Sequence, residues 1–305
     1  SQFGYEVLLN SKKVVITEGA KVLVFNGETG IFALGIGRKF PKSSIYSTDL
    51  NARNLKITER NIDSNHDVGN VNALDPEKLS PDDHGYSGPY ETVIYNPGRF
   101  DSKDLIASQL ETLKNVVAEG GNIYILTHKG AGLDGITERI HQVFPSWSET
   151  EPIERGRGGF RIFRISPTPL DHSAELKSEA KKVQVNILGK SFVVETYPSL
   201  FSSSEIDRGT RLLVETVAER ETGQDQRILD VGCGWGAIGL CWAMAHPKGD
   251  ITMIDVDFRA VEASMKNIEL LGLANRAKAL ITPDLKTTPI GSFDLVISNP
   301  PFHAS

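Results

Sequence analysis

The chain has 305 residues, enough for two domains that each have a hydrophobic core. Its apolar fraction of 39%, charged fraction of 24% and net charge of −6 are typical of a soluble globular protein. They argue against an indiscriminate nucleic-acid binder, which is normally basic. No apolar run is long enough for a membrane span, and the amino terminus lacks a signal pattern. Because Cys233 and Cys241 match neither a metal site nor a disulfide framework, we expect no metal and a cytoplasmic protein.

The first half of the chain alternates short apolar runs with amphipathic ones. Strands are predicted at 22–25, 44–47, 91–95, 122–127, around 147–151 and 160–165. Helices are predicted at 31–37, 52–61, 103–118, with a Gly-Gly stop, and 132–144. Alternating strands and helices imply βαβ units around a parallel sheet, and the last two strands favour an antiparallel edge.

The second half begins after a segment rich in Ser, Pro and charged residues, 166–182, which we interpret as a linker. A hairpin is predicted at 183–196 and a helix at 207–220. Further strands are predicted at 227–231, 250–255, 277–282 and 293–298, with helices at 237–245 and 258–271. Since the first half continues for about three more strands, we expect the second domain to be incomplete in this chain.

The two halves share an internal repeat. Residues 21–62 align without a gap onto residues 227–268, at a constant offset of 206. Asp49 falls on Asp255, and with three residues of slippage Asn96-Pro97 falls on Asn299-Pro300. The chain is therefore predicted to be a duplicated α/β domain.

Glycines and acidic residues follow the strands of the second copy. The segment Asp230-Val-Gly-Cys-Gly-Trp-Gly236 permits a tight turn that a ligand can approach closely. A related loop serves dinucleotides, but Asp230 at the strand end favours pairing with a cationic amine over a pyrophosphate. Asp255 ends the next strand, where a carboxylate accepts hydrogen bonds from ribose hydroxyls. Asp284 follows the third strand and suits an adenine amino group, or else caps a turn.

The segment Ser298-Asn-Pro-Pro-Phe-His303 follows the fourth strand of this copy. The Asn299 side-chain oxygen and the Pro300 carbonyl can accept hydrogen bonds from an NH2 group. Pro300 and Pro301 fix the backbone, and Phe302 offers a face on which a base can stack. An ordinary Pro-Pro turn after a strand is the alternative interpretation.

These four strand ends resemble the seven-stranded S-adenosylmethionine-dependent methyltransferases, and Asn299-Pro-Pro-Phe resembles the variant that methylates exocyclic or amide nitrogens. With His303, Phe201-Ser202 and Asp207-Arg-Gly-Thr-Arg-Leu-Leu, the pattern is similar to the tandem-domain ribosomal RNA guanine-N2 methyltransferases of the small-subunit, 16S type. The resemblance implies two Rossmann-like domains, S-adenosylmethionine as cofactor, and ribosomal RNA or the small ribosomal subunit as partner.

The resemblance also implies roles for residues at matching positions. Those expected at the cofactor are Asp230, Gly232, Cys233, Gly234 and Gly236 for its methionine part, Asp255 and Val256 for its ribose, Asp284 for its adenine, and Gly209, Thr210 and Asn299 around the pocket. Those expected at the target guanine are Asn299, Pro300, Pro301 and Phe302. His303 would accept a proton or contact a phosphate, although such a histidine is more often an ordinary loop residue.

The first copy lacks most of this pattern. Val24, Asn26 and Glu28 stand where the second copy has Asp230, Gly232 and Gly234. Side chains at tight-turn positions, including a glutamate in the pocket, should exclude the cofactor. We therefore expect residues 1–165 to be non-catalytic and residues 183–305 to form the catalytic domain.

Arginines near the end of the first copy are candidates for RNA contact. They are Arg155, Arg157, Arg161 and Arg164. A charge run is more often a solvated face, so this interpretation stays open beside that one. Two other functions also stay open: methylation of a protein glutamine amide or adenine N6, and an inert RNA-binding or assembly module. A fused pair of domains favours a monomer.

Overall fold

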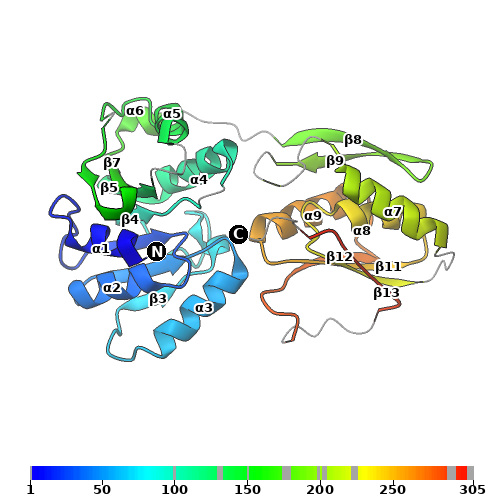
Figure 1. Ribbon diagram of the computed structural model, residues 1–305, viewed down its shortest axis with the longest axis horizontal. Coiled ribbons are helices and arrows are strands. Elements are labelled where there is room, and N and C mark those ends of the chain that lie inside the picture. Colours follow the sequence, from blue (N-terminus) through cyan, green and yellow to red (C-terminus); the bar gives the residue numbers. More distant parts are fainter. Residues whose placement is uncertain are drawn as a thin grey trace. The chain divides into compact units, whose positions relative to one another are not determined.

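The computed structural model describes residues 2–98, 101–128, 133–149, 151–173, 180–197, 200, 205–220, 226–286 and 293–300. The chain divides into two compact units, one of residues 1–50 and 54–177 and the other of residues 51–53 and 178–305. In each unit, helices pack against a sheet whose central strands are parallel (Figure 1).

The first unit contains a seven-stranded sheet. Its elements are, in chain order, α1 (Gln2–Asn10), β1 (Lys21–Phe25), α2 (Ile31–Lys39), β2 (Ser44–Thr48), α3 (Ala52–Asp63), β3 (Val71–Ala73), the 3-10 helix η1 (Pro76–Leu79), β4 (Tyr90–Tyr95), α4 (Lys103–Val116), β5 (Val117–His128), α5 (Leu133–Val143), β6 (Glu154–Arg155), the 3-10 helix η3 (Arg157–Gly159), β7 (Phe160–Ile165) and α6 (Pro169–Ser173). The strand order is β3-β2-β1-β4-β5-β7-β6. β7 runs antiparallel to β5 and β6, whereas the other pairs are parallel.

Strand β1 is buried on both faces of this sheet, which explains its continuous run of apolar residues. Leu23 and Phe25 belong to the core on one face, and Val22 and Val24 to the core on the other. All four are at most 1% exposed. β1 therefore lies at the centre of the unit, and its carboxyl end opens onto the loop that precedes α2.

The second unit repeats the central part of this arrangement. Its elements are β8 (Lys181–Ile187), β9 (Lys190–Thr196), α7 (Arg208–Arg220), β10 (Arg227–Val231), α8 (Ala237–Ala245), β11 (Asp250–Asp255), α9 (Phe258–Leu270), β12 (Ala277–Ile281) and β13 (Leu295–Ser298). The parallel order β12-β11-β10-β13 corresponds to β3-β2-β1-β4, and β8 and β9 form a separate antiparallel hairpin. The predicted α/β duplication is confirmed.

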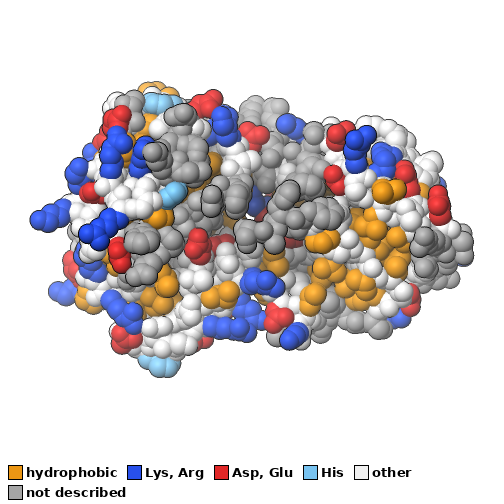
Figure 2. Space-filling view, viewed as in Figure 1, with side chains coloured by type: hydrophobic (Ala, Val, Ile, Leu, Met, Phe, Trp, Pro, Cys, Tyr) orange, Lys and Arg blue, Asp and Glu red, His pale blue; other side chains and the backbone are white. Residues whose placement is uncertain are grey.

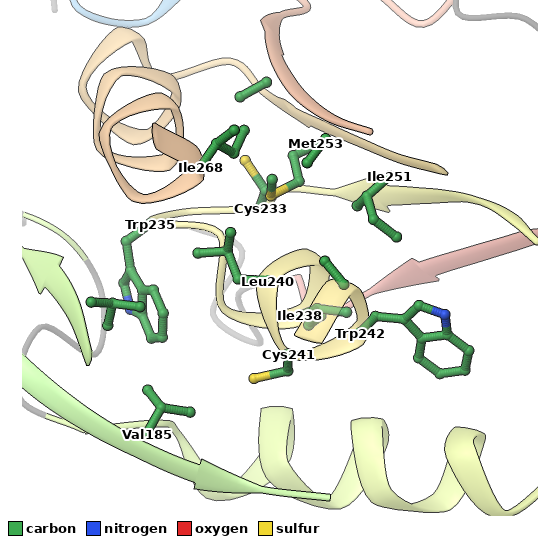
Figure 3. Close-up of a cluster of buried hydrophobic side chains, with 14 of the residues drawn as sticks. Val185, Cys233, Trp235, Ile238, Leu240, Cys241, Trp242, Ile251, Met253 and Ile268 are labelled. Carbon is green, nitrogen blue, oxygen red and sulfur yellow. The ribbon is translucent and has the colours of Figure 1, made fainter. Parts of the chain in front are cut away.

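The core of the second unit forms mainly where helix α8 packs on the sheet. Figure 3 shows Ile238, Leu240 and Trp242 of α8 in one cluster with Ile251 and Met253 of β11. Among the described strands β13 pairs only with β10, and its Val296 is 59% exposed. Hydrophobic side chains also gather on the visible face of this unit in Figure 2.

The predictions were wrong at several boundaries of the first unit. Residues 147–149 are not a strand, because Trp147 is anchored by its side chain, whose Nε1 donates to the Arg164 carbonyl at 2.8 Å. The antiparallel edge strand is β6 instead. Helix α4 ends at Val116, and β5 runs on through the Gly120-Gly121 pair that was predicted as a helix stop, with Gly120 at a φ of 71°. Helix α1 and strand β3 were not predicted.

Part of the segment that was interpreted as a linker packs on the first unit. Asp171 of α6 has no exposed surface, and its carboxylate accepts hydrogen bonds from the Ser146 and Thr168 backbone N–H groups at 2.9 and 2.7 Å. The far end of the segment already belongs to β8, which begins at Lys181.

Candidate active site

The loop between β10 and α8 turns through three glycines with left-handed backbone conformations. Gly232, Gly234 and Gly236 have φ values of 73°, 56° and 93°, which L side chains adopt with strain. A Cβ placed on Gly232 or Gly234 would meet no atom within 4 Å. At Gly236 a Cβ would lie 2.9 Å from Leu240 Cδ1, so this glycine lets α8 pack closely. The first two glycines therefore border open space, and the third serves packing.

Asp255, at the end of β11, holds this loop from the neighbouring strand. Its Oδ2 accepts a hydrogen bond from the Gly234 N–H at 3.0 Å, and its Oδ1 accepts one from the Asp257 N–H at 3.0 Å. Burial raises the pKa of this carboxyl above its usual value. On the other side of the loop, the Ser264 hydroxyl donates to the Gly234 carbonyl at 2.9 Å.

Asp230 lies beneath the loop. It has no exposed surface, and its Oδ2 accepts a hydrogen bond from the Gly239 N–H in α8 at 2.9 Å. Its Oδ1 is buried and has no hydrogen-bond partner among the described residues. Burial raises the pKa of Asp230 to about 7. The hydrogen bond from Gly239 ties this carboxyl to α8. The pairing of Asp230 with a ligand amine stays a prediction.

Cys233 and Val256 flank the two ends of this region. The Cys233 side chain lies in the core with Met253 and Ile268 (Figure 3) and is 5% exposed. Burial raises the pKa of its thiol, which argues against a reactive thiolate. Any ligand contact at Cys233 would therefore come from its backbone. Val256 is half-buried directly after β11.

Asn299 follows β13 and contacts the start of helix α7. Its Nδ2 donates to Thr210 Oγ1 at 2.9 Å and to Asp207 Oδ2 at 3.3 Å. Its Oδ1 makes no hydrogen bond to the residues that the structure describes. Gly209 lies against this pair, because a Cβ there would stand 3.7 Å from Asn299 Nδ2. The predicted residues Gly209, Thr210 and Asn299 thus come together.

The structure says less about the remaining residues that were predicted at the site. Asp284 is half-buried in the turn after β12, where its Oδ1 accepts a hydrogen bond from the Lys286 N–H at 3.0 Å. This is the turn geometry of the alternative interpretation. Pro300 is exposed. Of the predicted residues, those that lie outside the described part of the chain are Phe201, Ser202, Pro301, Phe302 and His303.

The arginines of the first unit are partly engaged by acidic neighbours. Arg155 pairs with Glu151, and Arg164 pairs with Glu149. Arg161 is half-buried on β7, and Arg157 is exposed. Lys and Arg side chains on the visible face of this unit are interspersed with acidic ones (Figure 2). This mixture of charges is as typical of an ordinary solvated surface as of an RNA-binding surface.

The matching loop of the first unit keeps the backbone and fills the space. Asn26, Glu28 and Gly30 have φ values of 55°, 52° and 75°, close to those of the three glycines at offset 206. The Asn96 Nδ2 donates to Glu28 Oε1 at 3.4 Å, so the glutamate side chain reaches toward the end of β4. The space above the loop therefore holds the chain's own side chain.

Sequence reasoning missed the support that two matching pairs of side chains give to the two loops. The Thr58 hydroxyl donates to the Glu28 carbonyl, as the Ser264 hydroxyl does to that of Gly234. The Asn61 and Asn267 amides donate to the Thr29 and Trp235 carbonyls at 2.8 and 3.2 Å. The signal was available, because each pair recurs at the offset of 206.

Residues 191–305 match the family model of the methyltransferase small domain. This match spans most of the second unit. The described residues contain no group of His, Cys, Asp and Glu side chains able to hold a metal ion. They also include no helix that is both long and apolar enough to cross a membrane.

Two similar proteins carry the name ribosomal RNA small subunit methyltransferase C. The one from Pseudomonas entomophila (strain L48) is 30% identical over 205 residues, or 66% of this chain and 57% of the relative. The one from Haemophilus influenzae (strain PittEE) is 27% identical over 280 residues, or 92% of this chain and 76% of the relative. The chain thus spans little more than half of the first relative. The resemblance drawn from the motifs is confirmed by these relatives.

A solved structure covers nearly the whole chain. It is the T. thermophilus 16S rRNA N2 G1207 methyltransferase (RsmC) in complex with AdoMet and guanosine, with a TM-score of 0.76 and 22% identity over 98% of this chain and 74% of that one. This likeness confirms the predicted fold of two Rossmann-like methyltransferase domains.

Proposed function

We propose that the second unit transfers a methyl group from S-adenosylmethionine to the exocyclic N2 amine of a guanine in 16S ribosomal RNA. The observation that carries the proposal is the Asn299 amide, which lies at the carboxyl edge of the sheet and whose Nδ2 donates to Asp207 and Thr210. The glycine loop that leaves room for a ligand lies at the end of β10, the strand that pairs with β13. Parallel sheets bind ligands at this edge.

The residues at this edge fit the cofactor. Open space lies over Gly232 and Gly234, and a half-buried carboxylate, Asp255, ends the adjacent strand. When bound, S-adenosylmethionine supplies an electrophilic methyl group on a sulfonium. The loop backbone would accommodate its methionine part, Asp255 and Val256 its ribose, and Asp284 its adenine. Asp230 would support the loop from below, and Thr210 would border the pocket.

The target amine would be held by acceptors. Asn299 Oδ1 and the Pro300 carbonyl would accept its two hydrogens, and these bonds would strengthen as positive charge develops on the nitrogen. Hydrogen bonds to a charged group contribute about 1.5–3 kcal/mol each. Pro301 and Phe302 would hold the ring, and the base must leave its stack to reach them.

The first unit would serve as a non-catalytic scaffold or as an RNA-binding surface. Its loop carries Glu28 and Asn26 where the second unit has glycines, and its exposed Arg157 is the best remaining candidate for a phosphate contact. His303 is a second candidate. The partner would be ribosomal RNA or the small ribosomal subunit, in keeping with the names of the relatives.

The experiment labels total RNA and total protein with tritiated S-adenosylmethionine and the full chain, then digests the products to monomers. We expect counts in N2-methylguanosine from 16S RNA. An Asn299→Ala variant should lose most of this activity, whereas Asn96→Ala, the matching change in the first unit, should retain it.

Three outcomes would contradict the proposal. Counts in N6-methyladenosine or in methylglutamine would assign the enzyme to another amine. Full turnover by the Asn299→Ala variant would remove the role of the amide. RNA retention without methyl transfer, and without binding of S-adenosylmethionine, would favour an inert RNA-binding module.

A further inference from the structure

Two acceptors at the start of helix α7 receive hydrogen bonds from the NH2 group of the Asn299 side chain. Asp207 Oδ2 and Thr210 Oγ1 are both acceptors toward Nδ2, at 3.3 and 2.9 Å. An amide has one acceptor oxygen and one donor nitrogen that are nearly equal in shape. Which of the two faces a substrate is therefore decided by the groups on the other side.

Asp207 is itself fixed by the helix. Its Oδ2 accepts a hydrogen bond from the Thr210 N–H at 3.1 Å, and its carbonyl accepts one from the Arg211 N–H at 2.9 Å, as an N-cap residue does. Thr210 is 6% exposed. The two acceptors thus stand on a rigid element, and the carboxylate that caps the helix also contacts the amide.

Gly209 allows this close approach. A Cβ at this position would lie 2.9 Å from Asp207 Oδ2 and 3.7 Å from Asn299 Nδ2. Its backbone is not in the left-handed region, so the glycine is needed for space and not for conformation. Any larger residue would press on the carboxylate that holds the amide.

We propose that Asp207 and Thr210 are positioning residues that fix the orientation of the Asn299 amide, so that Oδ1 and not Nδ2 faces the target. This inference rests on the proposed function. With the amide fixed, the site accepts a group that donates hydrogen bonds and rejects one that only accepts them. The pair therefore selects an exocyclic amine over a ring position that lacks one, as in inosine.

Two variants remove the acceptors with little change in shape. Thr210→Val deletes the hydroxyl, and Asp207→Asn places an NH2 group where an acceptor stands while keeping a good N-cap. Either change lets the Asn299 amide rotate and present its nitrogen to the amine. We expect kcat to fall about tenfold to a hundredfold, because a charge-assisted hydrogen bond is lost in the transition state. The KM for RNA should stay nearly unchanged.

A structural role alone would not produce the remaining readouts. Thr210→Ser, which restores the hydroxyl, should recover most of the kcat lost in Thr210→Val. Thr92→Val, a matched change of a buried threonine on β4, should leave kcat unaltered. In the presence of S-adenosylhomocysteine, the ratio of the Kd for inosine to the Kd for guanosine should decrease in Thr210→Val and in Asp207→Asn.

A measurement without turnover separates this inference from the proposed function. The Asn299 side-chain amide, assigned by its loss in Asn299→Ala, should give two well-resolved, slowly exchanging proton signals in 15N spectra of the full chain. Both should become fast-exchanging in Thr210→Val. Unchanged signals in that variant, or an unchanged kcat beside altered signals, would overturn the positioning role. A parent chain that methylates no guanine would overturn the proposed function, and the amide signals would then decide the held orientation by themselves.

Discussion

The two glycine-type loops of this chain share a scaffold and differ in what fills it. In both, the carboxylate that ends the second strand accepts a hydrogen bond from the loop N–H at 3.0 Å, from Glu28 to Asp49 and from Gly234 to Asp255. In both, a hydroxyl of the following helix donates to the carbonyl of that same loop residue. The loop conformation is therefore maintained by these hydrogen bonds even where glycine is absent.

The difference lies in the side chains above the loop. Glu28 adopts a left-handed φ of 52°, which costs an ordinary residue about 1 kcal/mol or more. Its side chain bonds to Asn96, the counterpart of Asn299. We therefore expect the first unit not to bind the cofactor, because side chains fill a loop whose backbone conformation is retained.

The largest expected effect on S-adenosylmethionine binding comes from replacing Gly234 with the residue that the first unit has at the matching position. Gly234→Glu copies the first unit into the second, and because Glu28 tolerates the same backbone, the fold should survive. Isothermal titration should detect no S-adenosylmethionine binding by this variant. Gly272→Glu is the matched control, since Gly272 also has a positive φ of 67° and open space beside it. Binding that persists in Gly234→Glu would contradict the account.

The second-largest difference between the two units should come from removing the carboxylate at the end of the second strand in each of them. Asp255→Ala should weaken S-adenosylmethionine binding about a hundredfold, because hydrogen bonds to a charged group and the support of Gly234 are lost together. Asp49→Ala should leave the affinity unchanged and lower only the stability of the first unit. Equal losses of affinity in both variants, measured by titration, would mean that both loops bind the cofactor.

The carboxyl beneath the second loop has no counterpart in the first, where Val24 takes its place. Because the folded pKa of Asp230 is about 7 and its ordinary value is 3.8, the protonated form favours the folded state. This contribution is complete below pH 4 and is lost as the pH rises through 7, with a slope of about 1.4 kcal/mol per pH unit. Asp230→Asn should lack this component.

Urea unfolding of parent and Asp230→Asn between pH 5 and 8 measures that difference. The free energy of unfolding of the parent, relative to the variant, should decrease up to about pH 7 and then level off. A difference that is constant with pH would show that the carboxyl ionises normally in the folded chain.

Removing the hydroxyl that supports each loop should give the smallest effects on the free energy of unfolding, and these effects should be similar in the two units. Ser264→Ala and Thr58→Val each remove one hydrogen bond to a loop carbonyl, and each should lower the free energy of unfolding of its own unit by about 1 kcal/mol. Ser64→Ala, in the exposed turn directly after α3, is the control and should change little. A large loss in one unit and none in the other would argue against a common scaffold.

Much of the site could be predicted because its residues recur at fixed spacing. The repeat at an offset of 206 located the loop, and the acidic strand ends followed from the position of Asp255 after an apolar run. The burial of Asp230 could not be predicted in the same way, since a residue near a strand end can face either the ligand or the core. Val24 at the matching position was the available signal for the core.

Two other features could not be predicted because they depend on contacts between residues that are distant in the sequence. Trp147 was predicted in a strand, which aromatic residues favour. In the structure, one hydrogen bond from its indole to β7 holds it outside the sheet. The role of Asp207 depends on an amide that follows 92 residues later, and no local pattern indicates that contact.

Hydrogen exchange of the full chain with and without S-adenosylhomocysteine tests the central claim most directly. The account predicts that the ligand slows exchange in peptides covering residues 231–239 and 254–258, and leaves peptides covering residues 25–33 and 48–52 unchanged. Equal protection of both loops, or protection of the first loop alone, would contradict a chain in which one loop is filled and the other is open.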